Sequence, residues 1–65
     1  MKKIKVYFCE IIDLNHKKHQ IKTDDEIKIL SFIRQHKGKV AGIKKGERLV
    51  SEEKFKEIQR EENFR

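Results

Sequence analysis

The amino-acid sequence predicts a small single α+β domain, in which a short, mostly antiparallel sheet packs with two helices in the order β-β-α-β-β-α. Three observations support this prediction. Residues 3–12 alternate apolar side chains with a period of two, two later segments open with helix-capping residues, and Gly46 lies in a polar run between two apolar stretches. The 65 residues are expected to form one domain, because two shorter domains would each lack a core.

The first predicted element is a strand over residues 3–12, which are rich in β-branched and aromatic types. The alternation divides its apolar side chains between two faces, with Ile4, Val6 and Phe8 on one and Tyr7, Cys9 and Ile11 on the other. The residue types favour this strand over a helix, although a helical spacing also connects Ile4, Phe8, Ile11 and Ile12. Asp and Asn within residues 13–16 predict a turn, and residues 18–22 predict a short return strand.

The next segment predicts a helix that begins at Thr23 and ends near His36. Thr23 can cap the first turn, and Glu26 completes a capping box three residues later. The carboxylates of the first turn also favour the positive end of the helix dipole. A broad apolar arc runs along the helix through Ile27, Ile29, Leu30, Phe32 and Ile33. Its basic last turn is followed by Gly38, which is typical of a helix end.

Residues 39–50 predict a hairpin whose turn is centred on Gly46, since glycine supplies the positive φ that tight turns require. Ser51 then caps a final helix. Phe55 is expected to pack back on the residue before the cap as a hydrophobic staple. Beyond Gln59 the sequence is strongly polar, and we expect a solvated, frayed end.

Charge is the strongest compositional signal. The chain carries 17 Lys and Arg against 11 Asp and Glu, a formal net charge of +6, and 43% of its residues are charged. The cations concentrate between residues 34 and 48, at Arg34, Lys37, Lys39, Lys44, Lys45 and Arg48. A basic field of this kind attracts polyanions, and nucleic acid above all. A lysine-rich surface with no ligand would give the same composition.

The sequence predicts no enzyme activity, no cofactor and no small-molecule substrate. His16, His19 and Cys9 supply at most three metal ligands, and the two lysines between the histidines oppose a cation. No orienting Asp or Asn stands at a recognisable spacing from Cys9 to activate it as a nucleophile. With one cysteine no internal disulfide can form, which suits a reducing cytoplasm. No apolar run approaches the length of a membrane span, so no membrane partner is expected.

Residues 30–58 resemble the second half of a small excisionase-type winged-helix domain. In that family a recognition helix is followed by a two-stranded wing and a short closing helix. The matching residues are Leu30, Ile33 and Arg34 of the helix, Gly46 and Arg48 of the wing, and Phe55 and Ile58 of the closing helix. The resemblance implies a winged-helix variant of the predicted fold. It also implies sequence-specific DNA binding as an accessory to recombination or transcription.

We therefore predict a small, cytoplasmic, non-enzymatic protein that binds nucleic acid through a basic hairpin. DNA is favoured over RNA, because RNA modules present aromatic side chains for stacking and Phe32 and Phe55 look buried. The six cations would contact phosphates, with Arg48 the candidate to read a base edge. One alternative is a phage- or plasmid-type regulatory protein that binds and modulates a host protein. A second is a homodimer that buries Ile29, Phe32 and Ile33.

Overall fold

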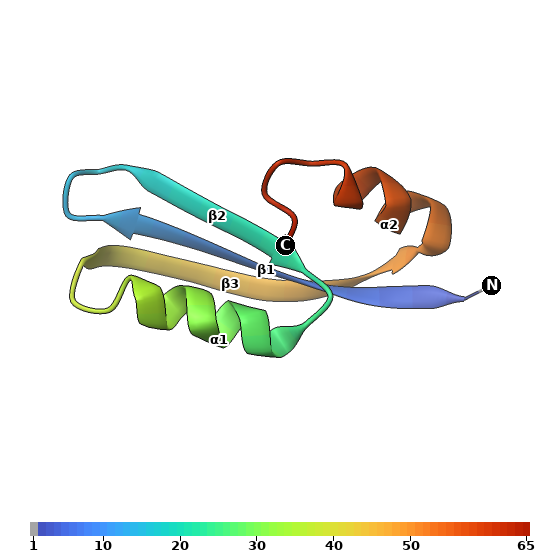
Figure 1. Ribbon diagram of the computed structural model, residues 1–65, viewed down its shortest axis with the longest axis horizontal. Helices are drawn as coiled ribbons and strands as arrows, with labels where there is room; N and C mark the ends of the chain where they lie inside the picture. The colour runs from blue at the N-terminus through green and yellow to red at the C-terminus, as the bar shows by residue number, and fades with distance from the viewer. Residues whose placement is uncertain (1) are drawn as a thin grey trace.

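The computed structural model describes residues 2–65 as a three-stranded antiparallel sheet with a helix against each face (Figure 1). The elements follow in the order β1 (Lys3–Asp13), β2 (Lys18–Thr23), α1 (Glu26–Gln35), β3 (Val40–Ser51) and α2 (Glu52–Gln59). Their order across the sheet is β2-β1-β3, so β1 is central. The predicted α+β class is confirmed, with five elements in place of six.

The β1–β2 hairpin forms where the sequence predicts it. Asp13 closes the turn, since its carboxylate accepts hydrogen bonds from the backbone N–H groups of Asn15, at 2.8 Å, and Lys17, at 2.9 Å. His16 completes the reversal with a positive φ of 64°. The antiparallel register then sets Cys9 opposite Ile21. The two predicted faces of β1 are confirmed, because Tyr7, Cys9 and Ile11 pack in the α1 core whereas Ile4 and Val6 pack in the α2 core.

Helix α1 begins two residues later than predicted. Its cap is Asp25, whose carboxylate accepts from the backbone N–H of Ile27 at 3.0 Å. The prediction that Thr23 is the cap is wrong, because Thr23 belongs to the end of β2 and is completely buried there. Its hydroxyl instead accepts from the backbone N–H of Asp25 at 3.1 Å. Gly38 follows the helix with a φ of 83°, as its place in the sequence predicts.

The predicted hairpin over residues 39–50 is wrong, since β3 is one unbroken strand. Nearly all of its length pairs with β1, and these long-range backbone bonds replace the local turn. Gly46 lies directly opposite Phe8, and a Cβ on Gly46 would lie only 2.5 Å from Cζ of that ring. Gly46 therefore makes room for an aromatic ring that lies across the strand, and its φ is not positive.

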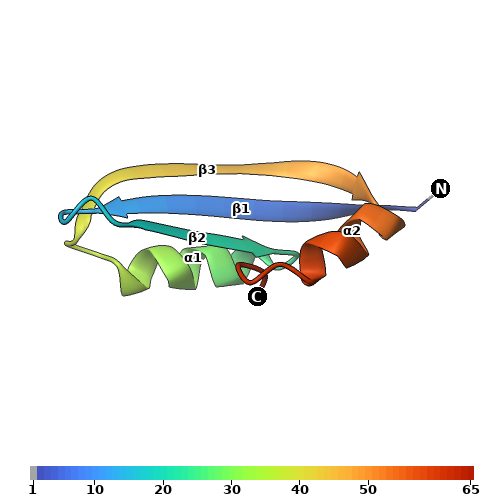
Figure 2. The same ribbon diagram turned by 90° about the horizontal axis from the view of Figure 1, so that it is seen from above.

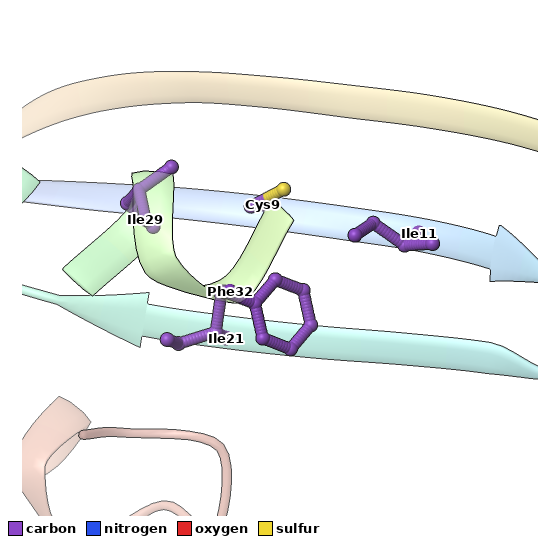
Figure 3. Close-up of a cluster of buried hydrophobic side chains, with 5 residues drawn as sticks. All are labelled: Cys9, Ile11, Ile21, Ile29 and Phe32. Atoms are coloured by element: carbon purple, nitrogen blue, oxygen red, sulfur yellow. The ribbon is translucent and has the colours of Figure 1, made fainter. Parts of the chain in front are cut away.

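Two separate cores lie on opposite faces of the sheet. The first joins α1 to β1 and β2 through Cys9, Ile11, Ile21, Ile29 and Phe32 (Figure 3). The second joins α2 to β1 and β3 through Val6, Val50, Phe55 and Ile58. Val50 and Phe55 belong to this same core, which confirms the predicted hydrophobic staple. The two helices lie toward opposite ends of the long sheet, so each covers only part of its face (Figures 1 and 2).

The chain after α2 folds back onto the edge of β2, so the predicted frayed end is wrong. The backbone N–H of Lys22 donates to the carbonyl of Asn63 at 2.9 Å, and that of Arg65 donates to the carbonyl of Lys22 at 2.8 Å. Phe64 packs edge-on against Phe55, with ring centroids 5.6 Å apart. No helix among residues 2–65 is both long and apolar enough to span a membrane.

Candidate binding groove

The six cations singled out in the sequence do not form one patch. Within β3 the register places Lys44 opposite Glu10 and Arg48 opposite Val6, on the face that α2 covers in part. Lys45 is opposite Cys9 and therefore points to the other face. The other three cations, Arg34, Lys37 and Lys39, belong to the last turn of α1 and to its connection with β3. Only Lys44 and Arg48 are brought together.

These two cations line a groove of about 350 Å³ between the sheet and α2. From β1 it is lined by Val6, Phe8, Cys9 and Glu10. The remaining lining side chains come from both neighbouring strands, from α2 and from the segment after it; the polar ones are Gln20, Lys22, Lys44, Arg48, Lys54 and Glu61. The groove exists because α2 is short, so it leaves the middle of this face uncovered. We call this feature the binding groove.

Phe8 is the groove residue that the sequence did not reveal. Its ring is partly buried against Gly46, and the guanidinium carbon of Arg48 lies 5.8 Å from the ring centroid. An arginine over an aromatic face is attracted by the ring quadrupole. The sequence indicated only that Phe8 shares a face with Val6. Its pairing with a glycine depends on the register of β1 against β3, which no local pattern specifies.

Most other charges at the groove are already paired. The carboxylate of Glu10 accepts from Lys18 at 3.1 Å and from Gln20 at 3.2 Å, and the hydrogen bond from Lys18 is the main reason that its pKa is lowered. Glu61 forms an ion pair with Lys22, and Lys54 forms one with Glu57 at 3.5 Å.

Lys44 and Arg48 differ from these groups. No ion pair to either cation is formed among residues 2–65, and both side chains are exposed. The binding groove therefore offers two free cations beside an aromatic ring. An anion that also carries a flat ring matches this chemistry.

Two of the histidines contact each other, and the cysteine lies apart from them in the α1 core. His19 lies 2.9 Å from the Asp13 carboxylate, its ring centroid is 4.9 Å from that of His36, and the ring nitrogen of His36 donates to the Phe32 carbonyl. Within residues 2–65 no three metal-binding side chains meet. Cys9 is buried in the α1 core, and its burial raises the pKa of the thiol, which favours the unreactive neutral form.

Comparison of the chain with protein-family models, with curated protein sequences and with solved structures gave no match. The resemblance to excisionase-type domains therefore remains a prediction. The strongest functional clue is the binding groove itself, where a partly buried aromatic ring and two unpaired cations share one face of the sheet.

Proposed function

We propose that this chain is a small non-enzymatic nucleic-acid-binding protein with a regulatory or accessory role, and that a single-stranded segment lies in the binding groove. One observation supports this above the others: Phe8 lines the groove together with Lys44 and Arg48, which form no ion pair among residues 2–65. Proteins that bind single strands combine a cationic groove along the backbone with aromatic side chains on which bases stack.

Phe8 supplies the stacking surface in this proposal. Its ring is held against the sheet at Gly46, with the Arg48 guanidinium carbon 5.8 Å from its centroid. A base stacked on an aromatic side chain contributes about 1–3 kcal/mol, whatever its sequence. Phe32 and Phe55 are buried, as the sequence predicts, but Phe8 removes the reason for preferring DNA to RNA. Both are therefore candidate partners.

Lys44 and Arg48 supply the phosphate contacts. They lie four residues apart on the same face of β3, each two residues from Gly46 and its overlying ring. Each phosphate neutralised on a single strand releases counterions, so the logarithm of affinity falls with the logarithm of salt concentration by about 0.7 per contact.

This proposal shares its class of partner with the excisionase-type resemblance but uses a different contact. That family needs a scaffold helix before the recognition helix, and here the corresponding segment is β1. The wing would require a turn at Gly46, where β3 runs straight through. We therefore place the contact on the sheet, and not on a helix inserted into a duplex groove.

Fluorescence anisotropy with labelled oligonucleotides tests the proposal. Single-stranded DNA and RNA of the same 12-base sequence, and a 30-base-pair duplex, are titrated at several salt concentrations. We expect the single strands to bind more tightly than the duplex, near micromolar at about 150 mM salt. Phe8→Leu, which keeps an apolar side chain but removes the aromatic face, should weaken single-strand binding by about fivefold or more.

A charge-matched pair of variants locates the site. Lys44→Glu with Arg48→Glu removes both free groove cations, whereas Lys37→Glu with Lys39→Glu makes the same change in net charge outside the groove. Only the first pair should reduce the slope of the logarithm of affinity against the logarithm of salt concentration, by about 1.4 for the two lost contacts. Equal losses in both pairs, or dissociation constants above about 100 μM at 150 mM salt, would reject the proposal. The chain would then be better treated as a regulator that binds a protein partner.

A further inference from the structure

The two outer edges of the sheet differ in how they are protected. The edge of β2 is short and is partly covered by the C-terminal segment, which bonds to Lys22. The edge of β3 extends over twelve residues, and no strand pairs with it among residues 2–65. Helix α1 packs on β1 and β2, so it leaves this edge open. A long unpaired edge is a template for another strand.

We infer that the open edge of β3 pairs with β3 of a second copy of this chain, antiparallel and centred on Gly46. The pairing would join two three-stranded sheets into one of six strands. Nucleic acid is not required for this pairing. A domain of 65 residues gains from such pairing, because its own core is small.

Charge complementarity selects this register. Along the middle of β3 the α1 face carries four exposed side chains, in the order Ile43, Lys45, Glu47 and Leu49. Centring on Gly46 sets each Lys45 opposite Glu47 of the second copy, and each Ile43 opposite Leu49. Opposite charges and apolar side chains directly across strands both stabilise a sheet. Centring on residue 45 or 47 would instead set two lysines or two glutamates face to face.

Pairing of Ile43 with Leu49 of the second copy would bury apolar side chains that are exposed to water in the single chain. The side chains of Ile43 and Leu49 are 46% and 61% exposed in the single chain, although neighbouring apolar residues of β1 are buried. Glu47 forms an exposed ion pair with Lys5 of its own chain, with 3.6 Å between nitrogen and oxygen, on the side of β3 away from the open edge. On the groove face the register sets Lys44 opposite Arg48, and this repulsion limits the affinity.

Sedimentation equilibrium of the full chain, without nucleic acid, tests the inference. From about 1 μM to about 1 mM chain we expect a monomer–dimer equilibrium. Lys45→Glu and Glu47→Lys should each weaken self-association by about tenfold or more, because each places like charges across both symmetric pairs. An equimolar mixture of the two variants should associate again, since every cross-strand pair is then of opposite sign. The double variant in one chain should likewise self-associate.

Lys28→Glu is the matched control, since it makes the same charge change on the exposed surface of α1 and should not alter self-association. A second readout needs no variant: amide exchange along β3 should slow as the wild-type chain is concentrated, while exchange in α2 should not. A wild-type chain that stays monomeric at about 1 mM, or variants that fail to associate when mixed, would overturn the inference.

Discussion

The two faces of the sheet are packed to different degrees, although β1 supplies a core to both. On the α1 face, Cys9, Ile11 and Thr23 are at most 1% exposed. On the α2 face, Val50, Phe55 and Ile58 remain 6–9% exposed, and the binding groove opens beside them. The α1 face thus holds the most completely buried side chains, whereas the shorter helix α2 leaves exposed the groove that we propose for function.

Breaking the tighter core should have the largest effect. Ile11→Ala removes a completely buried side chain, so we expect it to lower the free energy of unfolding by about 2–5 kcal/mol. That loss is comparable with the whole stability expected of so small a domain. Urea denaturation followed by circular dichroism measures it at low chain concentration. Ile43→Ala makes the same chemical change on an exposed site and should shift the unfolding free energy by less than about 0.5 kcal/mol. Similar losses in both variants would contradict the described packing.

A smaller effect on stability is expected from a substitution on the groove face. Gly46→Ala places a methyl group against the Phe8 ring, so the ring must move, at a cost of about 1–3 kcal/mol in unfolding free energy. Gly42→Ala is the matched control in the same strand, because a Cβ there meets nothing within 4 Å. The control should be neutral or should stabilise the fold by about 0.4–1 kcal/mol, because alanine reduces the conformational entropy of the unfolded chain. The two variants are compared by thermal unfolding, and single-strand affinity should fall only for Gly46→Ala. Equal melting temperatures would show that the ring does not lie over Gly46.

The smallest effect is a pH dependence with one carboxylate on each face. Hydrogen bonds lower the pKa of Asp13 below its ordinary 3.8, chiefly through His19, and that of Glu10 below its ordinary 4.5, chiefly through Lys18. Both pKa values are lower in the folded chain than in the unfolded chain. The two carboxylates therefore contribute to folding stability above the ordinary pKa values, and this contribution is lost as the pH falls through the pKa values of the folded chain. Asp13→Asn and Glu10→Gln should therefore each flatten the fall in melting temperature below about pH 4.5. If both variants lose melting temperature below about pH 4.5 as steeply as the wild-type chain, neither hydrogen bond contributes to stability.

Local signals predicted much of this fold. The alternation in residues 3–12, the Asp13 turn, the Ser51 cap and Gly38 each act within a few residues, and each lies where predicted. The wrong predictions concern residues whose structure depends on contacts with segments far away in the sequence. Gly46 looked like a turn residue because its neighbours are polar, but pairing with β1 extends β3 through it.

The candidate site was harder to predict for the same reason. A continuous strand separates adjacent cations, so Lys44 and Lys45 point to opposite faces and the predicted basic hairpin does not exist. Phe8 enters the site only through its cross-strand partner. The C-terminal segment was expected to be solvated because it is polar, yet Phe64 anchors it on Phe55.

Cys9 gives the chain a built-in chemical reporter. It is the single thiol in the sequence, it is 1% exposed, and its burial raises the thiol pKa. A thiol reagent can reach it only when α1 lifts from the sheet or the whole domain opens. The rate of thiol labelling under native conditions thus measures how often the α1 core opens, and no probe needs to be introduced to observe this opening.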